Sequence, residues 1–218
     1  MANNFITNNK QTKTLKGRLN TLISISDELK FLVGYFYFSG WSDIYLSLQR
    51  NPQQKLKLLI GLQVCNYLGN IIEYAEQQEE NSSMDEEFQK YLVSLGFALN
   101  NEEMDTEEFY NQVRFFVQMI EENRLEIRKT ENPNHAKLYL FHLNEDQAEI
   151  QGMSGQFITG SSNLTRSGLH NQEEFNVEIK DYGYADAVQY FDELWERATP
   201  ITDNLENRKI LIDFIKNK

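Results

Sequence analysis

Short apolar runs alternate along the chain with stretches in which apolar residues recur at helical spacing. The apolar runs predict strands over 31–38, 55–62, 125–129, 137–141, 157–161 and 175–180. The helical spacing predicts helices over 11–26, 41–49, 66–98, 105–122, 184–198 and 204–218. The succession of strand, helix and strand over 31–62 favours parallel pairing, because parallel strands need a crossover connection. The pattern predicts an α/β fold with a mixed, largely parallel central sheet flanked by helices on both faces.

Two segments add detail to this fold. Residues 31–38 are apolar on both faces, which is typical of a central strand covered by helices on each side. Residues 142–156 are polar and contain two glycines, so we expect a hairpin loop between two neighbouring strands.

Length and composition bound the class of protein. The 218 residues, of which 40% are hydrophobic, suffice for one sizeable α/β domain. The single cysteine, Cys65, excludes a disulfide within the chain and fits a reducing compartment. The first residues are polar without the apolar core of a signal peptide, and no apolar run is long enough to span a membrane. We expect a cytoplasmic protein that does not use a membrane.

The net charge of −12 is concentrated in one segment. Residues 66–108 contain twelve acidic residues and one lysine, so the rest of the chain is nearly neutral. We interpret residues 66–122 as an acidic helical insertion. Its charge suits either a solvated helical face or an acidic flap that mimics or repels nucleic acid. A nucleic-acid partner is therefore compatible with the acidic composition.

The candidate chemistry begins with His135 and Lys137. They are two residues apart at the start of a predicted strand, so they point to the same face. A histidine beside a cation suits an anionic oxygen. Downstream, the run Gly160-Ser161-Ser162-Asn163 ends another predicted strand in a turn whose small side chains and amides can close on an anion. Phosphate is the obvious candidate.

His135-x-Lys137 followed by Gly160-Ser161-x-Asn163 resembles the HKD signature of the phospholipase D superfamily. The longer run "GSSNLTRSGLHNQEEFNVEI" is similar to the nuclease-type branch, found in restriction endonucleases and ahead of bacterial helicase motors. The resemblance extends from about Phe31 to Arg197. It departs at His142, where the pattern has an aspartate. It implies phosphodiester hydrolysis of DNA without a metal or cofactor.

The resemblance assigns a role to each site residue. His135 attacks phosphorus and forms a phosphohistidine, while Lys137, Asn163 and Ser161 face the non-bridging oxygens. The resemblance also implies a glutamate that orients the histidine. Glu174 is the expected residue, with Glu173 and Glu178 as alternatives.

Four basic residues are candidates for gripping a nucleic-acid backbone beside the site: Arg124, Arg128, Lys129 and Arg166. The alternative for Arg124, Arg128 and Lys129, which precede His135, is that they are solubilising charges at the edge of the sheet.

The histidine count bears on assembly. Superfamily chemistry uses two motif histidines, whereas this chain has one His-x-Lys among its three histidines. We therefore expect a homodimer that puts two copies of His135 face to face at a two-fold axis. A site built from His135 and His142 of one chain is the alternative, although a regular strand would place them on opposite faces.

The domain assignment combines these elements with the resemblance. Residues 1–200 form the phospholipase D-like domain, and 201–218 form a helix that we expect to lead into a further helicase or restriction module. The expected function is metal-independent hydrolysis of DNA. A catalytically silent nucleic-acid-binding or dimerisation module of a larger helicase is the alternative, and a lipid phosphodiesterase is a third hypothesis.

Overall fold

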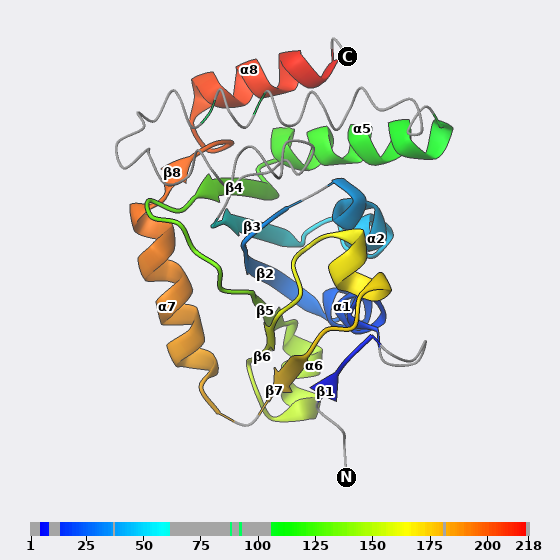
Figure 1. The fold of residues 1–218 in the computed structure, drawn as a ribbon, viewed down its shortest axis with the longest axis vertical. Helices are drawn as coiled ribbons and strands as arrows, with labels where there is room; N and C mark the ends of the chain where they lie inside the picture. The colour runs from blue at the N-terminus through cyan, green and yellow to red at the C-terminus, as the bar shows by residue number, and fades with distance from the viewer. Residues whose placement is uncertain are drawn as a thin grey trace.

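The computed structural model describes residues 5–8, 14–36, 38–61, 88, 92, 106–180 and 182–216. Its strands form one eight-stranded sheet in the order β1-β7-β6-β5-β2-β3-β4-β8 (Figure 1). The strands are β1 (Phe5–Ile6), β2 (Ser26–Val33), β3 (Lys55–Ile60), β4 (Leu125–Lys129), β5 (Leu138–Leu143), β6 (Gly155–Gly160), β7 (Asn176–Ile179) and β8 (Thr199–Pro200). The helices are α1 (Leu15–Ile23), α2 (Phe38–Gln49), α5 (Glu107–Glu121), α6 (Glu145–Gln151), the π-helix η3 (Ser167–Asn171), α7 (Tyr184–Arg197) and α8 (Leu205–Lys216).

The sheet is mixed, as predicted, but the expectation that it is largely parallel is wrong. Only β2 with β3 and β3 with β4 pair in parallel, and the other five pairings of the described strands are antiparallel. The predicted strand–helix–strand unit is confirmed as β2, α2 and β3. The strand β5 is almost wholly buried yet antiparallel to both neighbours, so burial on both faces did not indicate strand direction here.

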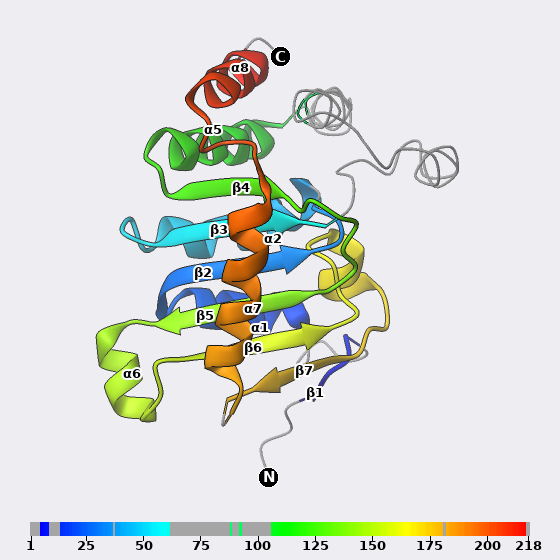
Figure 2. The ribbon, with the colours of Figure 1, turned by 90° about the vertical axis from the view of Figure 1, so that its left-hand side faces the viewer.

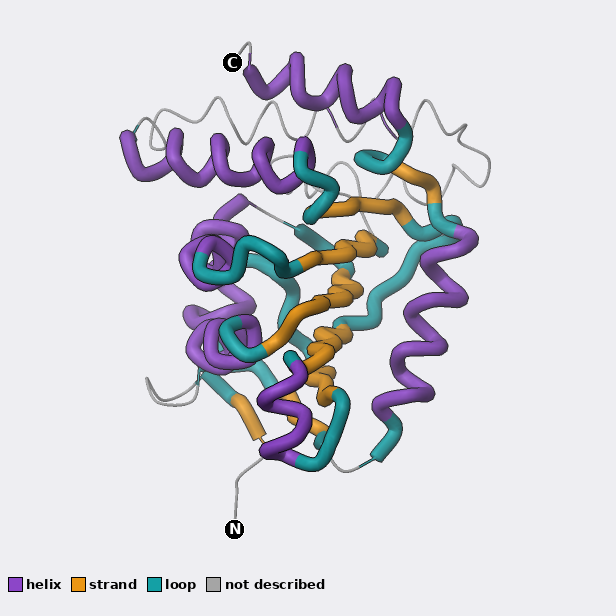
Figure 3. Tube along the Cα trace, turned by 180° about the vertical axis from the view of Figure 1, so that it is seen from behind, coloured by secondary structure: helices purple, strands orange, loops and turns teal. Residues whose placement is uncertain are grey.

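Helices cover both faces of the sheet, as predicted. Of the described helices, α7 packs on one face over an apolar cluster that includes Leu59, Leu140 and Phe191. On the other face, α1, α2, α5, α8 and η3 enclose a larger core around Phe31 and Trp41. Figure 3, seen from behind, shows this separation, with α7 on one side of the strands and α1 and α2 on the other.

Three predicted segments differ from the structure. The strand expected at 31–38 is β2, Ser26–Val33, because Phe36 and Phe38 enter the large core after the strand has ended. The loop expected at 142–156 contains α6, whose seven residues include none that is buried. The insertion expected at 66–122 falls mainly outside the described residues, although α5 confirms its last predicted helix.

The strand directions bring separated segments to one edge of the sheet. The carboxyl ends of β2, β3, β4 and β6 lie beside the amino ends of β5 and β7, because Leu138 pairs with Leu32 and Thr159, and Asn176 with Gly160. Figure 2 shows β2, β3 and β6 pointing to this side and α6 at the opposite edge. We call it the site edge, because the residues that leave or enter these strand ends include His135, Lys137, Ser161, Asn163 and Glu174.

Candidate active site

A glycine at the end of β3 holds the segment that carries His135. The carbonyl oxygen of Gly61 accepts a hydrogen bond from the amide of Asn134 at 3.0 Å, and the Asn134 side chain accepts one from the amide of Ala136 at 2.8 Å. A Cβ atom on Gly61 would lie 1.9 Å from the carbonyl oxygen of Asn134, so only glycine permits this approach. The segment leaves the His135 side chain exposed at the site edge.

Lys137 is held beside His135. Its ammonium donates to the carbonyl oxygen of His135 at 2.6 Å, and its own carbonyl oxygen accepts from the Thr159 hydroxyl at 2.9 Å. Burial lowers the pKa of Lys137, and the negative charge of Glu174 raises it in part. The two residues are thus close enough to interact, although Glu174 lies 37 positions further along the chain.

The turn after β6 is fixed by a residue that the sequence did not single out. Asn176 is fully buried, and its side chain donates to the Ser162 hydroxyl at 2.8 Å and accepts from the Ser162 amide at 3.2 Å. Tyr139, also buried, donates from its hydroxyl to the carbonyl oxygen of Ser162 at 2.8 Å. These contacts hold Ser161 and Asn163 on either side of Ser162. The sequence signal that could have pointed to Asn176 is an asparagine at a core-facing position of a strand with alternating apolar and polar residues.

Asn163 is oriented by the segment after β2. Its side-chain oxygen accepts a hydrogen bond from the amide of Tyr35 at 3.0 Å. Because the oxygen is engaged, the group that Asn163 can present to a ligand is the Nδ2 donor. This is the polarity that an anionic oxygen requires, so the orientation suits the predicted role.

Ser161 connects the turn to Glu174. Its hydroxyl donates to the Glu174 carboxylate and accepts from the amide of Phe175 at 3.0 Å. The charge of Glu174 also contributes, after burial, to raising the pKa of Tyr139. Glu174 therefore lies among the predicted site residues. The hydrogen bonds found between described residues do not include one from His135 to the Glu174 carboxylate, so the orienting role of Glu174 stays a prediction.

Two of the four predicted phosphate-gripping residues are structural. Arg124 is only 8% exposed, and its guanidinium donates to the carbonyl oxygens of Gln54 and Asn51. Arg128 donates to Asp203 at 2.8 Å and lies over the Trp195 ring. The predicted nucleic-acid contact is wrong for both, because these guanidinium groups stabilise the fold instead.

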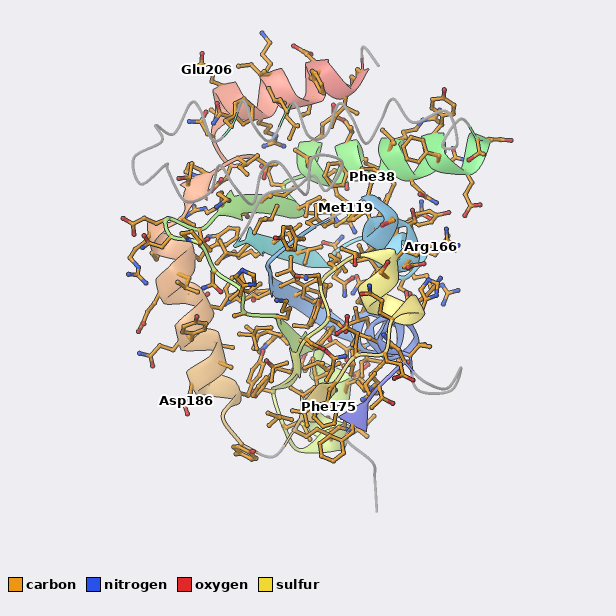
Figure 4. The ribbon with its side chains drawn as sticks, viewed as in Figure 1. Phe38, Met119, Arg166, Phe175, Asp186 and Glu206 are labelled. Atoms are coloured by element: carbon orange, nitrogen blue, oxygen red, sulfur yellow. The ribbon has the colours of Figure 1, made fainter. Side chains whose placement is uncertain are left out.

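The other two predicted bases lie near the site edge. The Lys129 ammonium donates to the carbonyl oxygen of Gly61 at 3.4 Å. Arg166 is exposed at the start of η3, and Figure 4 places it there. Their contact with a nucleic acid stays a prediction.

The alternative residues have other positions. Glu178 accepts two hydrogen bonds from Arg18 and contacts Lys180. Burial raises its pKa, but these cations outweigh burial and lower it. His142 lies at the far end of β5, within 3.4 Å of the Tyr184 hydroxyl, so the alternative site built from His135 and His142 of one chain is wrong.

Within the described part of the chain, no group of three or more histidine, cysteine or acidic side chains is arranged to hold a metal ion. The helices described there include none that is both long and apolar enough to cross a bilayer.

Comparison with known proteins supports the resemblance. Residues 97–195 match the family described as "Cardiolipin synthase, PLD-like domain". No curated protein matches the chain. The resemblance to the phospholipase D superfamily is confirmed by this match, which contains all five predicted catalytic residues.

Two solved structures share the fold at low identity. Polyphosphate kinase from Porphyromonas gingivalis is 7% identical with a TM-score of 0.51, over 99% of this chain and 28% of that one. Phosphatidylserine synthase from Haemophilus influenzae is 14% identical with a TM-score of 0.50, over 98% of this chain and 44% of that one. The phospholipase D family member Nuc from Salmonella typhimurium is 9% identical with a TM-score of 0.46, over 90% and 95%.

Proposed function

We propose that the chain hydrolyses phosphodiester bonds of DNA without a metal ion, through a phosphohistidine on His135, because residues 97–195 match a family of phospholipase D-like domains. The observation that carries the proposal is the meeting of His135, Lys137, Ser161, Asn163 and Glu174 at one edge of the sheet, although they come from three separate segments. The restriction or helicase setting stays a prediction.

The proposed reaction has two steps. A neutral His135 nitrogen attacks phosphorus, the bond from phosphorus to the leaving oxygen breaks, and that oxygen takes a proton from the partner subunit's His135. Water then attacks the phosphohistidine, gives its proton to the same partner histidine and releases the phosphate with regeneration of His135. Both histidines end in their starting protonation states, so no other reactant is needed.

The groups around His135 supply a positive charge and a neutral hydrogen-bond donor where the transition state develops negative charge. The Lys137 ammonium and the Nδ2 donor of Asn163 suit the non-bridging oxygens. This chain supplies one motif histidine at the site edge, so we propose a homodimer whose two site edges face each other. A chain that works alone would lack the proton donor.

The experiment that tests the function is cleavage of labelled single- and double-stranded DNA by the full chain in excess chelator. We expect cleavage to continue at an unchanged rate, because the proposed nucleophile and charges are all side chains. Loss of cleavage on chelation, restored by a divalent cation, would contradict the mechanism. Binding of DNA with no cleavage in any buffer would favour the alternative, a silent binding module.

Replacing Glu174 by glutamine should change the pH dependence of the reaction. The Glu174 charge raises the pKa of Lys137, so its removal lets Lys137 lose its proton at a lower pH. If cationic Lys137 is required, the high-pH limb of the kcat profile moves to lower pH in Glu174→Gln. The neighbouring exposed Glu173→Gln is the matched control. If the high-pH limb of the Glu174→Gln profile does not move, the charge of Lys137 is not required in the rate-limiting step.

A further inference from the structure

Two exposed aromatic side chains lie on opposite sides of the candidate site. Phe175 directly follows Glu174 and is 60% exposed. Tyr190, on α7, is 43% exposed, and its hydroxyl is 3.4 Å from the Asn134 side chain, next to His135. Figure 4 labels Phe175 near β7 and β1, at the end of the sheet away from β3, where Gly61 holds Asn134.

The backbone of Phe175 is held by the turn that carries Ser161. Its backbone amide donates to the Ser161 hydroxyl at 3.0 Å, and its carbonyl oxygen accepts from the Ser161 amide at 3.2 Å. A Cβ atom on Gly160 would lie 2.3 Å from that carbonyl oxygen, so the glycine permits the close approach. Phe5 supports the ring from the edge strand, with ring centroids 5.2 Å apart. Because the backbone of Phe175 is already held, little further backbone entropy is lost when the ring binds.

We propose that Phe175 and Tyr190 stack on unpaired bases on either side of the bound phosphodiester, which makes single-stranded nucleic acid the preferred substrate. The proposal rests on the function proposed above. Aromatic rings bind unpaired bases through their faces, whereas the bases of a duplex are already stacked on one another. The substrate would therefore be held by one ring beyond Ser161 and by the other beyond Asn134.

The surroundings of the two rings favour bases over a lipid or a second protein surface. Polar groups of Ser161, Glu174, Lys137, His135 and Asn134 lie between the two rings. A lipid tail or the core of a protein interface needs a continuous apolar surface depleted of charge. A nucleic-acid strand instead alternates charged phosphates with aromatic bases, which is the pattern that this edge presents.

The test measures binding in a His135→Ala background, which keeps the probe intact. The probe is an oligothymidylate with one 2-aminopurine, whose fluorescence falls when the base stacks on an aromatic ring, and the comparison is a duplex of the same length. We expect the single strand to bind at least about tenfold more tightly and its fluorescence to be quenched. Phe175→Leu and Tyr190→Leu should each weaken single-strand binding by roughly 5- to 100-fold, with little change for the duplex.

Matched variants separate stacking from general damage. Tyr182 is 75% exposed and follows β7 at the end away from the site, so Tyr182→Leu should bind the single strand like its parent. Phe175→Tyr keeps a ring and should retain quenching, whereas thermal unfolding of Phe175→Leu checks the fold. Equal affinity for both probes, or unchanged single-strand binding by Phe175→Leu and Tyr190→Leu, would overturn the proposal.

Two further results distinguish this inference from the proposed function. Hydrolysis of bis(4-nitrophenyl) phosphate by the wild-type chain, without any binding of the oligonucleotide, would overturn base stacking and leave the phosphodiesterase standing. Quenched binding without hydrolysis of either substrate would support stacking and overturn the enzyme. Displacement of the strand by anionic phospholipid vesicles, or loss of the dimer in Phe175→Leu, would assign the rings to a lipid or to a second copy and overturn the proposal.

Discussion

Replacing His135 by alanine is expected to lower the rate of phosphodiester hydrolysis by at least about 10³-fold, because it removes the nucleophile from one site and the proton donor from its mate. His135 is exposed, and the hydrogen bond that Lys137 makes is to its backbone carbonyl oxygen. The variant should therefore fold normally. Steady-state hydrolysis of a labelled oligonucleotide and thermal unfolding measure the two effects separately.

His142→Ala is the control, because His142 is exposed and lies at the opposite end of β5. Equal losses in the two variants would contradict the assignment of His135. Subunit mixing tests the shared site: refolding the wild-type chain with a tenfold excess of His135→Ala should reduce its activity roughly tenfold, because few dimers would contain two histidines. Undiminished activity in the mixture would show that each chain acts alone.

Gly61→Ala is expected to reduce kcat by roughly 10²-fold while the chain stays folded. The added methyl group would collide with the carbonyl oxygen of Asn134, so the segment that carries His135 must move outward. A displacement of about 1 Å at a reacting group is enough for a loss of this size. The strain should also lower the free energy of unfolding by about 1–3 kcal/mol. Oligonucleotide hydrolysis and thermal unfolding measure these effects.

The control for this change is Gly152→Asn, at the end of α6 and at the edge opposite the site. Gly152 has a positive φ of 67°, which asparagine tolerates, and a Cβ atom there would contact nothing within 4 Å. Its hydrolysis rate should equal that of the wild type. Retention of full activity by Gly61→Ala would show that the His135 segment is not held by its contact with Gly61.

Local patterns predicted most elements and the parallel pairing of β2 with β3, but not the antiparallel pairing of most other strands. The strands β3 and β4 and the helix α7 lie close to their predicted bounds, because each has a clear apolar period. The first half of β2 was missed because it contains polar residues, one of which, Lys30, pairs with Asp192 of α7 at 2.8 Å. The helix α6 buries no residue and so shows no period, although its capping residue Asn144 was present in the sequence.

Short motifs predicted which side chains gather at the candidate site. They did not predict the residues that hold these side chains in place, because those contacts depend on the fold. His135, Lys137, Ser161, Asn163 and Glu174 reach one edge as expected. The buried role of Arg124 could not be predicted, because its carbonyl partners belong to the segment before β3. The contact between Asn176 and Ser162 likewise depends on the pairing of two strands, which no local pattern contains.

The contact between the first and seventh strands has a consequence for how the protein is made. Asn176 holds the Ser162 turn and also donates to the carbonyl oxygen of Ile6, 170 residues earlier. When only the first 170 residues have left the ribosome, the nascent chain has neither Glu174 nor Asn176. At that stage β1 has no neighbouring strand to pair with, although His135 has already been synthesised. The candidate site can therefore form only after Glu174 and Asn176 have left the ribosome.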